Sequence, residues 1–123
     1  MSLERVARGK IGEDLACQEL ERRGYAILAR RYRSRVGEID IVAHDGPTLV
    51  FVEVKTREGH EFGDGAEAVT AFKRHRIGRV ALDYLARHRQ TECPCRFDVV
   101  SVALREGGAP AIEVYQNAFD MSC

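Results

Sequence analysis

Apolar positions recur at helical spacing in two parts of the chain. In the first part this spacing predicts a helix over residues 3–23, with Gly24 just beyond its end and a stripe of Ala7, Ile11, Leu15 and Leu20. The second helix is predicted to begin at about residue 67 or 70 and to end at His88. Its expected buried face consists of Ile77, Val80, Ala81, Tyr84 and Leu85. Gly9 and Gly12 are poor helix formers, and they indicate close packing or an irregular first turn.

Five further apolar stretches, rich in β-branched residues, predict strands. They cover residues 25–29, 37–43, 49–56, 96–102 and 111–115. The basic segment 30–35 is predicted to be a connection, and residues 57–65 a mobile loop. Asp45-Gly46 is a strong hairpin signal, so the second and third strands are expected to be antiparallel neighbours. The second helix lies between the third and fourth strands, as a crossover between parallel strands requires.

The order of one helix, three strands, one helix and two strands predicts an α/β fold with a mixed sheet. At 123 residues the chain is expected to form a single domain, residues 1–123. Its apolar runs are shorter than the roughly 18 residues of a membrane span, and the charged N-terminus lacks a signal-peptide pattern. We therefore expect a cytoplasmic protein without membrane association. The cysteines, at positions 17, 93, 95 and 123, are expected to be reduced thiols.

The formal net charge is zero, which argues against a generic nucleic-acid binder, but the basic residues are unevenly distributed. Between Glu21 and Glu38 no acid occurs among the arginines, which are Arg22, Arg23, Arg30, Arg31, Arg33 and Arg35. Between Glu67 and Asp83 there is again no acid, and the basic residues are Lys73, Arg74, Arg76 and Arg79. Such stretches are either phosphate-binding surfaces or solvated basic faces, and charge alone favours the latter.

Charged residues also occur inside the apolar strands, where they are unusual. Glu53 and Lys55 are two residues apart in the third strand, so both point to the same face. The second strand carries Asp40. A charge in a buried strand requires a partner or a ligand to offset its desolvation. Hairpin pairing of the two strands would bring Asp40 and Glu53 within reach of one ion.

Two carboxylates and a backbone carbonyl are the kind of oxygen ligands that Mg²⁺ prefers. Asp40, Glu53 and the Val54 carbonyl are the expected ligands, and Glu13 of the first helix is a candidate for a second ion or a metal water. A metal-bound water becomes a nucleophile toward phosphorus, and Lys55 would orient it or stabilise the phosphate charge. The alternative is a surface strand pair with a Glu53–Lys55 salt bridge and an exposed Glu13.

Two segments resemble the core signature of the PD-(D/E)xK nucleases. These are residues 37–40, Gly-Glu-Ile-Asp, and residues 51–55, Phe-Val-Glu-Val-Lys. Together with residues 9–16, 69–73 and 96–100, they are similar over roughly residues 8–115 to the YraN-like family of small bacterial proteins. That family is distantly related to archaeal Holliday-junction resolvases. The resemblance implies a restriction-endonuclease-like αβββαβ core. Ile39 precedes Asp40 where the nuclease signature has proline.

The resemblance implies a role for each matching residue. Asp40 and Glu53 would be metal ligands, Lys55 the catalytic lysine, and Glu13 the helix acid that completes the cluster. Glu38 would assist or be structural, and Asp98 structural. We expect nucleic-acid contacts from the basic residues, namely Lys73, Arg74, Arg76, Arg33 and Arg35.

These observations predict a Mg²⁺-dependent endonuclease, with Mn²⁺ as a substitute, that hydrolyses phosphodiester bonds of DNA. Branched or junction DNA is expected by analogy alone, and a homodimer is expected because a two-fold junction needs two cuts. The competing prediction is a non-catalytic nucleic-acid-binding or adaptor module that retains the fold. An RNA substrate is a weaker alternative, because the sequence has no aromatic stacking pair that favours single strands.

Overall fold

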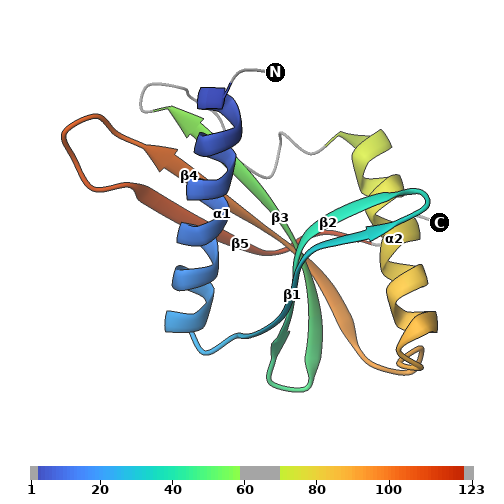
Figure 1. Ribbon diagram of the computed structural model, residues 1–123. Coiled ribbons are helices and arrows are strands. Elements are labelled where there is room, and N and C mark those ends of the chain that lie inside the picture. Colours follow the sequence, from blue (N-terminus) through green and yellow to red (C-terminus); the bar gives the residue numbers. More distant parts are fainter. Residues whose placement is uncertain (1–2, 59–69, 121–123) are drawn as a thin grey trace.

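The fold consists of one sheet with a helix on each side (Figure 1). A computed structural model describes residues 3–58 and 70–120, and the side chains from residue 7 onward. The elements are α1 (Leu3–Arg22), β1 (Ala26–Ser34), β2 (Gly37–Asp45), β3 (Thr48–Glu58), α2 (Ala71–Arg87), β4 (Cys95–Leu104) and β5 (Ala111–Phe119). The predicted order of elements is confirmed. Most of the predicted loop over 57–65 lies outside the described residues, as does Cys123.

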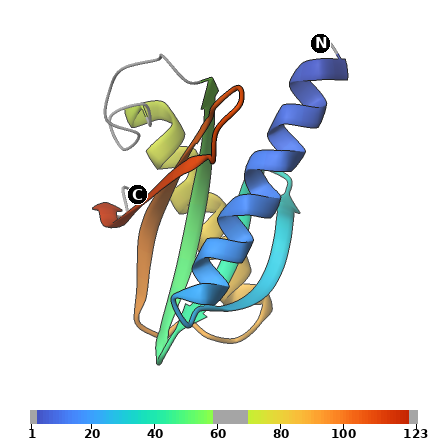
Figure 2. The same cartoon turned by 90° about the vertical axis from the view of Figure 1, so that its left-hand side faces the viewer.

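The five strands lie in the sheet in the order in which they occur in the chain. β2 and β3 are antiparallel, as the Asp45-Gly46 signal predicted, and β3 and β4 are parallel. The remaining neighbours, β1–β2 and β4–β5, are antiparallel, so the sheet is mixed. The predicted α/β class is confirmed, and α1 to β4 have the order and pairing of a restriction-endonuclease-like core. Figure 2 shows α1 in front of the sheet, with α2 on the opposite side.

Successive side chains of β3 divide between two hydrophobic clusters, one beneath each helix. Leu49 and Phe51 pack in the cluster that contains the buried residues of α2. Val50 and Val52 pack in the cluster that contains Ala16 and Leu20 of α1. The predicted apolar face of α2 is confirmed, because all five of its residues are buried. This alternation places Glu53 and Lys55 on the α2 face.

Helix α1 presents a different side to the sheet from the one that was predicted. Ile11, which was expected in the buried stripe, is 49% exposed, whereas Glu13 is only 6% exposed. The cause is Gly12, because a Cβ atom at this position would collide with the Thr56 side chain of β3. The helix backbone therefore lies directly against the strand, and the residues around Gly12 face inward. Of the two interpretations of the helix glycines, Gly12 supports close packing.

The prediction that residues 30–35 form a connection was wrong, because β1 continues to Ser34. Tyr32 lies in the middle of this basic segment and packs inward, with its ring 5.0 Å from that of Tyr84. Its hydroxyl donates a hydrogen bond of 2.9 Å to Asp83 of α2. The aromatic side chain thus gives the arginine-rich segment an anchor in the core, and the strand extends as far as that anchor.

A buried hydrogen-bond network surrounds Asp98, which is fully buried on β4. Its carboxylate accepts from Arg96 Nε and from the backbone N–H of Asn117, each at 2.9 Å. It also accepts from the Tyr25 hydroxyl at 2.9 Å. Arg96 reaches on to Asp45 at the end of β2, at 2.8 Å. The network joins four parts of the fold, in agreement with a structural role for Asp98.

Cys17 is buried, and Cys93 and Cys95 are free thiols, as was predicted for them. Among the described helices, neither is long and apolar enough to cross a membrane.

Candidate functional site

The two acids of the nuclease-like signature meet where the pairing of β2 and β3 stops. The last pair of this ladder is Ile41 with Val52. Continuing the register by one residue places Asp40 opposite Glu53. There the side chain of Asp40 replaces the backbone as a partner, because its Oδ2 accepts the Val54 N–H at 2.8 Å. A side-chain hydrogen bond joins Asp40 to Glu53.

The regular alternation of the strands is broken beside this pair. Ile39 packs on the α2 side of the sheet and Ile41 on the α1 side, although residues two apart in a regular strand share a face. In the neighbouring strand Arg31 has a left-handed backbone, with φ of 52°. As a result Asp40 lies between the two faces. It contacts Glu53 of the α2 face and also lies near Glu13 of α1.

Burial and mutual repulsion raise the pKa values of both acids. Burial is the main cause for Asp40, and the charges of Glu13 and Glu38 raise its pKa further. For Glu53, burial and the charge of Asp40 raise the pKa to about 8. Two carboxyl groups in hydrogen-bond contact cannot both ionise readily in a partly buried site. At neutral pH, without a bound cation, the pair therefore retains a proton.

This retained proton predicts how stability depends on pH. Because the folded pKa of Glu53 is raised, the stabilisation by its protonated form is complete below the unfolded pKa and is lost as pH rises through about 8. We expect wild-type stability to fall by up to about 4 kcal/mol between about pH 5 and pH 9, and Glu53→Gln to abolish this fall. Thermal unfolding followed across this pH range measures the effect. Parallel curves for the variant and the wild type would contradict it.

Two lysines approach the acid pair on the α2 face. Lys55 lies two residues beyond Glu53 on β3, and Lys73 extends from the first turn of α2. Their amino groups lie close to each other, and both charges act on Glu53. Burial and the proximity of Lys73 lower the pKa of Lys55. The helix start is fixed by Thr70, whose Oγ1 accepts the Lys73 N–H at 3.2 Å.

Glu13 lies on the opposite, α1 side and is already partnered. Its two carboxylate oxygens accept from Arg30 Nε at 3.0 Å and Arg31 Nε at 3.2 Å. The two arginines are neighbours, and the left-handed backbone at Arg31 lets both side chains reach the same acid. Glu13, Glu38 and Asp40 line a cavity of about 220 Å³ together with Val54. The alternative of an exposed helix acid therefore does not hold for Glu13. Its two ion pairs with Arg30 and Arg31 were not predicted from the sequence.

The donors at the pair fit Mg²⁺ by number and by type. Mg²⁺ is usually held by one or two carboxylates and keeps several waters. Asp40 and Glu53 supply the two carboxylates. Because the Val54 N–H points toward Asp40, its carbonyl points to the same side of the strand and adds a third oxygen. Within residues 3–58 and 70–120, no three acid, histidine or cysteine side chains form a larger chelating group. The two carboxylates also repel each other when both are ionised, and a bound cation would offset this repulsion.

The alternative of an exposed strand pair does not describe this site. Glu53 and Lys55 are both half-buried. Glu53 is hydrogen-bonded to Asp40 on the neighbouring strand, so its environment is not that of a surface ion pair.

The basic residues that were expected to contact nucleic acid divide into several environments. Arg33 forms a 3.0 Å ion pair with Glu38. Arg74 lies 5.7 Å from the centre of the Phe119 ring, and Arg76 lies 4.6 Å from that of Phe72. Lys73 belongs to the acid and lysine cluster, which sequence spacing could not show. Arg35 is exposed at the turn between β1 and β2.

Comparison with known proteins gives consistent matches over almost the whole chain. The model of the uncharacterised protein family UPF0102 matches residues 12–102. A UPF0102 protein of Geobacter metallireducens is 49% identical over 122 residues, which cover 99% of both chains. One from Symbiobacterium thermophilum is 50% identical over 111 residues, or 90% of this chain and 94% of that protein. One from Pelotomaculum thermopropionicum is 42% identical over 120 residues, or 97% of this chain and 100% of that protein.

Proposed function

Since the chain belongs to the uncharacterised UPF0102 (YraN) family, whose name states no activity, we propose its function from the site: a metal-dependent endonuclease that hydrolyses DNA phosphodiester bonds. The observation that carries this proposal is the meeting of Asp40 and Glu53 beside the Val54 backbone, with Lys55 and Lys73 next to them. Phosphodiester hydrolysis needs charge stabilisation around the phosphate and a means of moving protons. This cluster offers both.

Each residue of the site has a proposed role that follows from its charge and position. Asp40, Glu53 and the Val54 carbonyl would hold Mg²⁺, which when bound supplies positive charge and acidifies a water. Lys55 is half-buried beside Glu53, where it orients the attacking water and offsets charge on the phosphate. Lys73 keeps a second positive charge next to Lys55, which favours binding of the phosphate on this face.

The substrate proposed is DNA, with branched or junction DNA as the form suggested by analogy with the resolvases. A junction is two-fold symmetric, so symmetric cutting would require a second copy of this chain and hence a homodimer. The basic residues on α2 and on the β1–β2 turn support a polyanionic substrate.

The test is a titration of Mg²⁺ or Mn²⁺ against a panel of plasmid, linear duplex and four-way-junction DNA. We expect nicking that requires the cation and that is lost in Glu53→Gln. A thermal shift supplies an independent measurement, because Mg²⁺ should raise the melting temperature of the wild type and not that of Glu53→Gln. A matched control is Glu58→Gln, on the exposed end of the same strand, which should retain the cation response.

Nicking that Glu53→Gln retains would indicate a contaminating nuclease. Salt-sensitive DNA binding without cutting, in both the wild type and the variant, would instead support the non-catalytic adaptor.

A further inference from the structure

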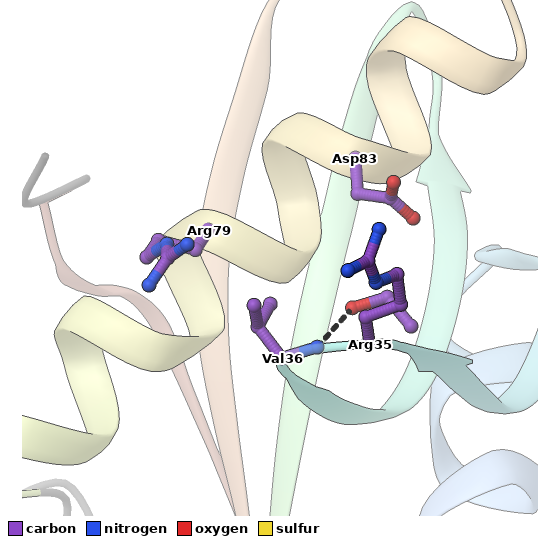
Figure 3. Close-up of a pocket in the computed structure, with 5 residues that line it drawn as sticks. Arg35, Val36, Arg79 and Asp83 are labelled. Carbon is purple, nitrogen blue, oxygen red and sulfur yellow. Dashed lines mark hydrogen bonds between the residues drawn. The ribbon is translucent and has the colours of Figure 1, made fainter.

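A groove separates the β1–β2 turn from helix α2, on the side of the sheet that carries Lys55 (Figure 3). It is a cavity of about 510 Å³ lined by Ser34, Arg35, Val36, Arg79 and Asp83. Figure 3 shows Arg35 and Arg79 on either side of Val36, one from the turn and one from the helix. Both arginines are exposed. The groove therefore has a cation at each side and an apolar centre.

We propose that this groove binds the sugar–phosphate backbone of the DNA strand, with Arg35 and Arg79 each contacting a different phosphate and Val36 facing the intervening sugar. The inference rests on the proposed function, and it names the contact that positions the substrate. Arginine is suited to such a site because its planar guanidinium donates to two phosphate oxygens at once.

The groups in the groove leave their donors available to a phosphate. Among the described residues, neither Arg35 nor Arg79 forms an ion pair. The Ser34 hydroxyl accepts from the Val36 N–H at 3.2 Å, so its own hydrogen remains free to donate. Asp83 is the single acid of the lining, and its carboxylate is held by Tyr32 at 2.9 Å and by Arg87 at 3.3 Å. Arg87 offsets the charge of Asp83, and the groove has a net positive charge.

The groove lies a few nucleotides from the acid pair. Along β2, Asp40 lies three positions beyond Gly37, or about 10 Å at 3.4 Å per residue. Along α2, Arg79 lies six positions beyond Lys73, or about 9 Å at 1.5 Å per residue. Arg76, which lies between Lys73 and Arg79 on α2, covers Gly37. A Cβ atom at Gly37 would lie 2.8 Å from the Cδ of Arg76, so the start of β2 and the helix are packed together here. At about 3.4 Å of helix axis per nucleotide, this distance corresponds to about three nucleotides.

The experiment measures how binding depends on salt, with a fluorescent duplex and a fluorescent four-way junction as probes. Binding is measured in Ca²⁺, which keeps the substrate intact if cleavage needs Mg²⁺. We expect Arg35→Ala/Arg79→Ala to reduce the slope of log affinity against log salt by about 2, and each single variant by about 1. Both arginines are exposed, so the melting temperature should not change.

The control is Arg22→Ala/Arg23→Ala, which removes the same charge from the end of α1 on the other side of the sheet. Both of these arginines pair with Glu19. This control should keep the wild-type slope. A double variant in the groove with the wild-type slope would overturn the inference, as would a wild type that binds neither probe.

A second measurement separates this inference from the proposed function. Single neutral methylphosphonates are placed along the cleaved strand. The wild type should lose cleavage when the neutral group lies about three nucleotides from the cut, and the double variant should not distinguish that position. If the double variant shows the change of slope but the wild type cuts no substrate in any cation, the groove stands and the endonuclease proposal fails. If it cuts but all positions are equivalent, the groove is refuted and the endonuclease stands.

Discussion

Lys55→Gln is expected to lower the single-turnover rate of DNA cleavage by about 100-fold or more, the range for loss of a catalytic acid, base or charge-stabilising group. Glutamine approximates the length of the lysine stem but supplies no positive charge. Lys55 is half-buried between Glu53 and Lys73, so no solvated cation can take over its position. The rate under saturating DNA and Mg²⁺ measures the effect.

The chain contains three lysines, and one of the other two, Lys10, provides a matched control for this substitution. Lys10 is exposed on α1 and pairs with Asp14 at 3.0 Å. Lys10→Gln should therefore keep the wild-type rate. Lys73→Gln should weaken substrate binding more than it slows the chemical step, because Lys73 is exposed whereas Lys55 is half-buried. A Lys55→Gln protein that cuts at the wild-type rate, or that changes only KM, would remove Lys55 from the mechanism.

Asp98→Ala is expected to destabilise the protein by about 3–5 kcal/mol, because it leaves the half-buried Arg96 without its main partner. The substitution also removes the acceptor of the Tyr25 hydroxyl and of the Asn117 N–H. Urea unfolding measures the free energy. If Asp98→Ala fails to fold, Asp98→Asn provides the measurement, because it retains one acceptor oxygen.

Asp45→Ala is the control for the Asp98 network, since it removes the other carboxylate that pairs with Arg96. The Asp45 side chain is 36% exposed, whereas that of Asp98 is fully buried. The exposed partner should contribute less than about 1 kcal/mol. Equal losses from the two substitutions would show that burial does not determine the energetics of this network.

Much of the fold could be predicted because local pattern and global packing agree. The β2–β3 hairpin was readable from Asp45-Gly46, and the face of α2 from its helical spacing. The errors occur where a contact distant in sequence decides the outcome. The rotation of α1 depends on Gly12 meeting Thr56, 44 positions later, and the length of β1 depends on Tyr32 meeting Tyr84. Apolar periodicity contains no information about either contact.

In the candidate site, too, features set by local sequence could be predicted, and features set by distant contacts could not. The hairpin signal was enough to predict Asp40 and Glu53 on adjacent strands, and the observed register then places them opposite each other. The approach of Lys73 could not be counted, since it depends on how α2 docks on the sheet. The left-handed backbone of Arg31, which brings two neighbouring arginines to Glu13, has no signal in the sequence, because arginine rarely adopts that conformation. Arg79 was visible only as one of several helix cations.

Because Asp40 accepts a hydrogen bond from the Val54 N–H, the side chain proposed as a metal ligand also helps to hold two strands together. Asp40 substitutes for a missing rung between two strands, so its loss would loosen the hairpin as well as empty the site. Glu53 and Lys55 do not replace a backbone hydrogen bond in this way. Under the proposed function, substitutions at positions 53 or 55 would therefore abolish activity and leave the hairpin paired, whereas a substitution of Asp40 would also weaken the junction of β2 and β3.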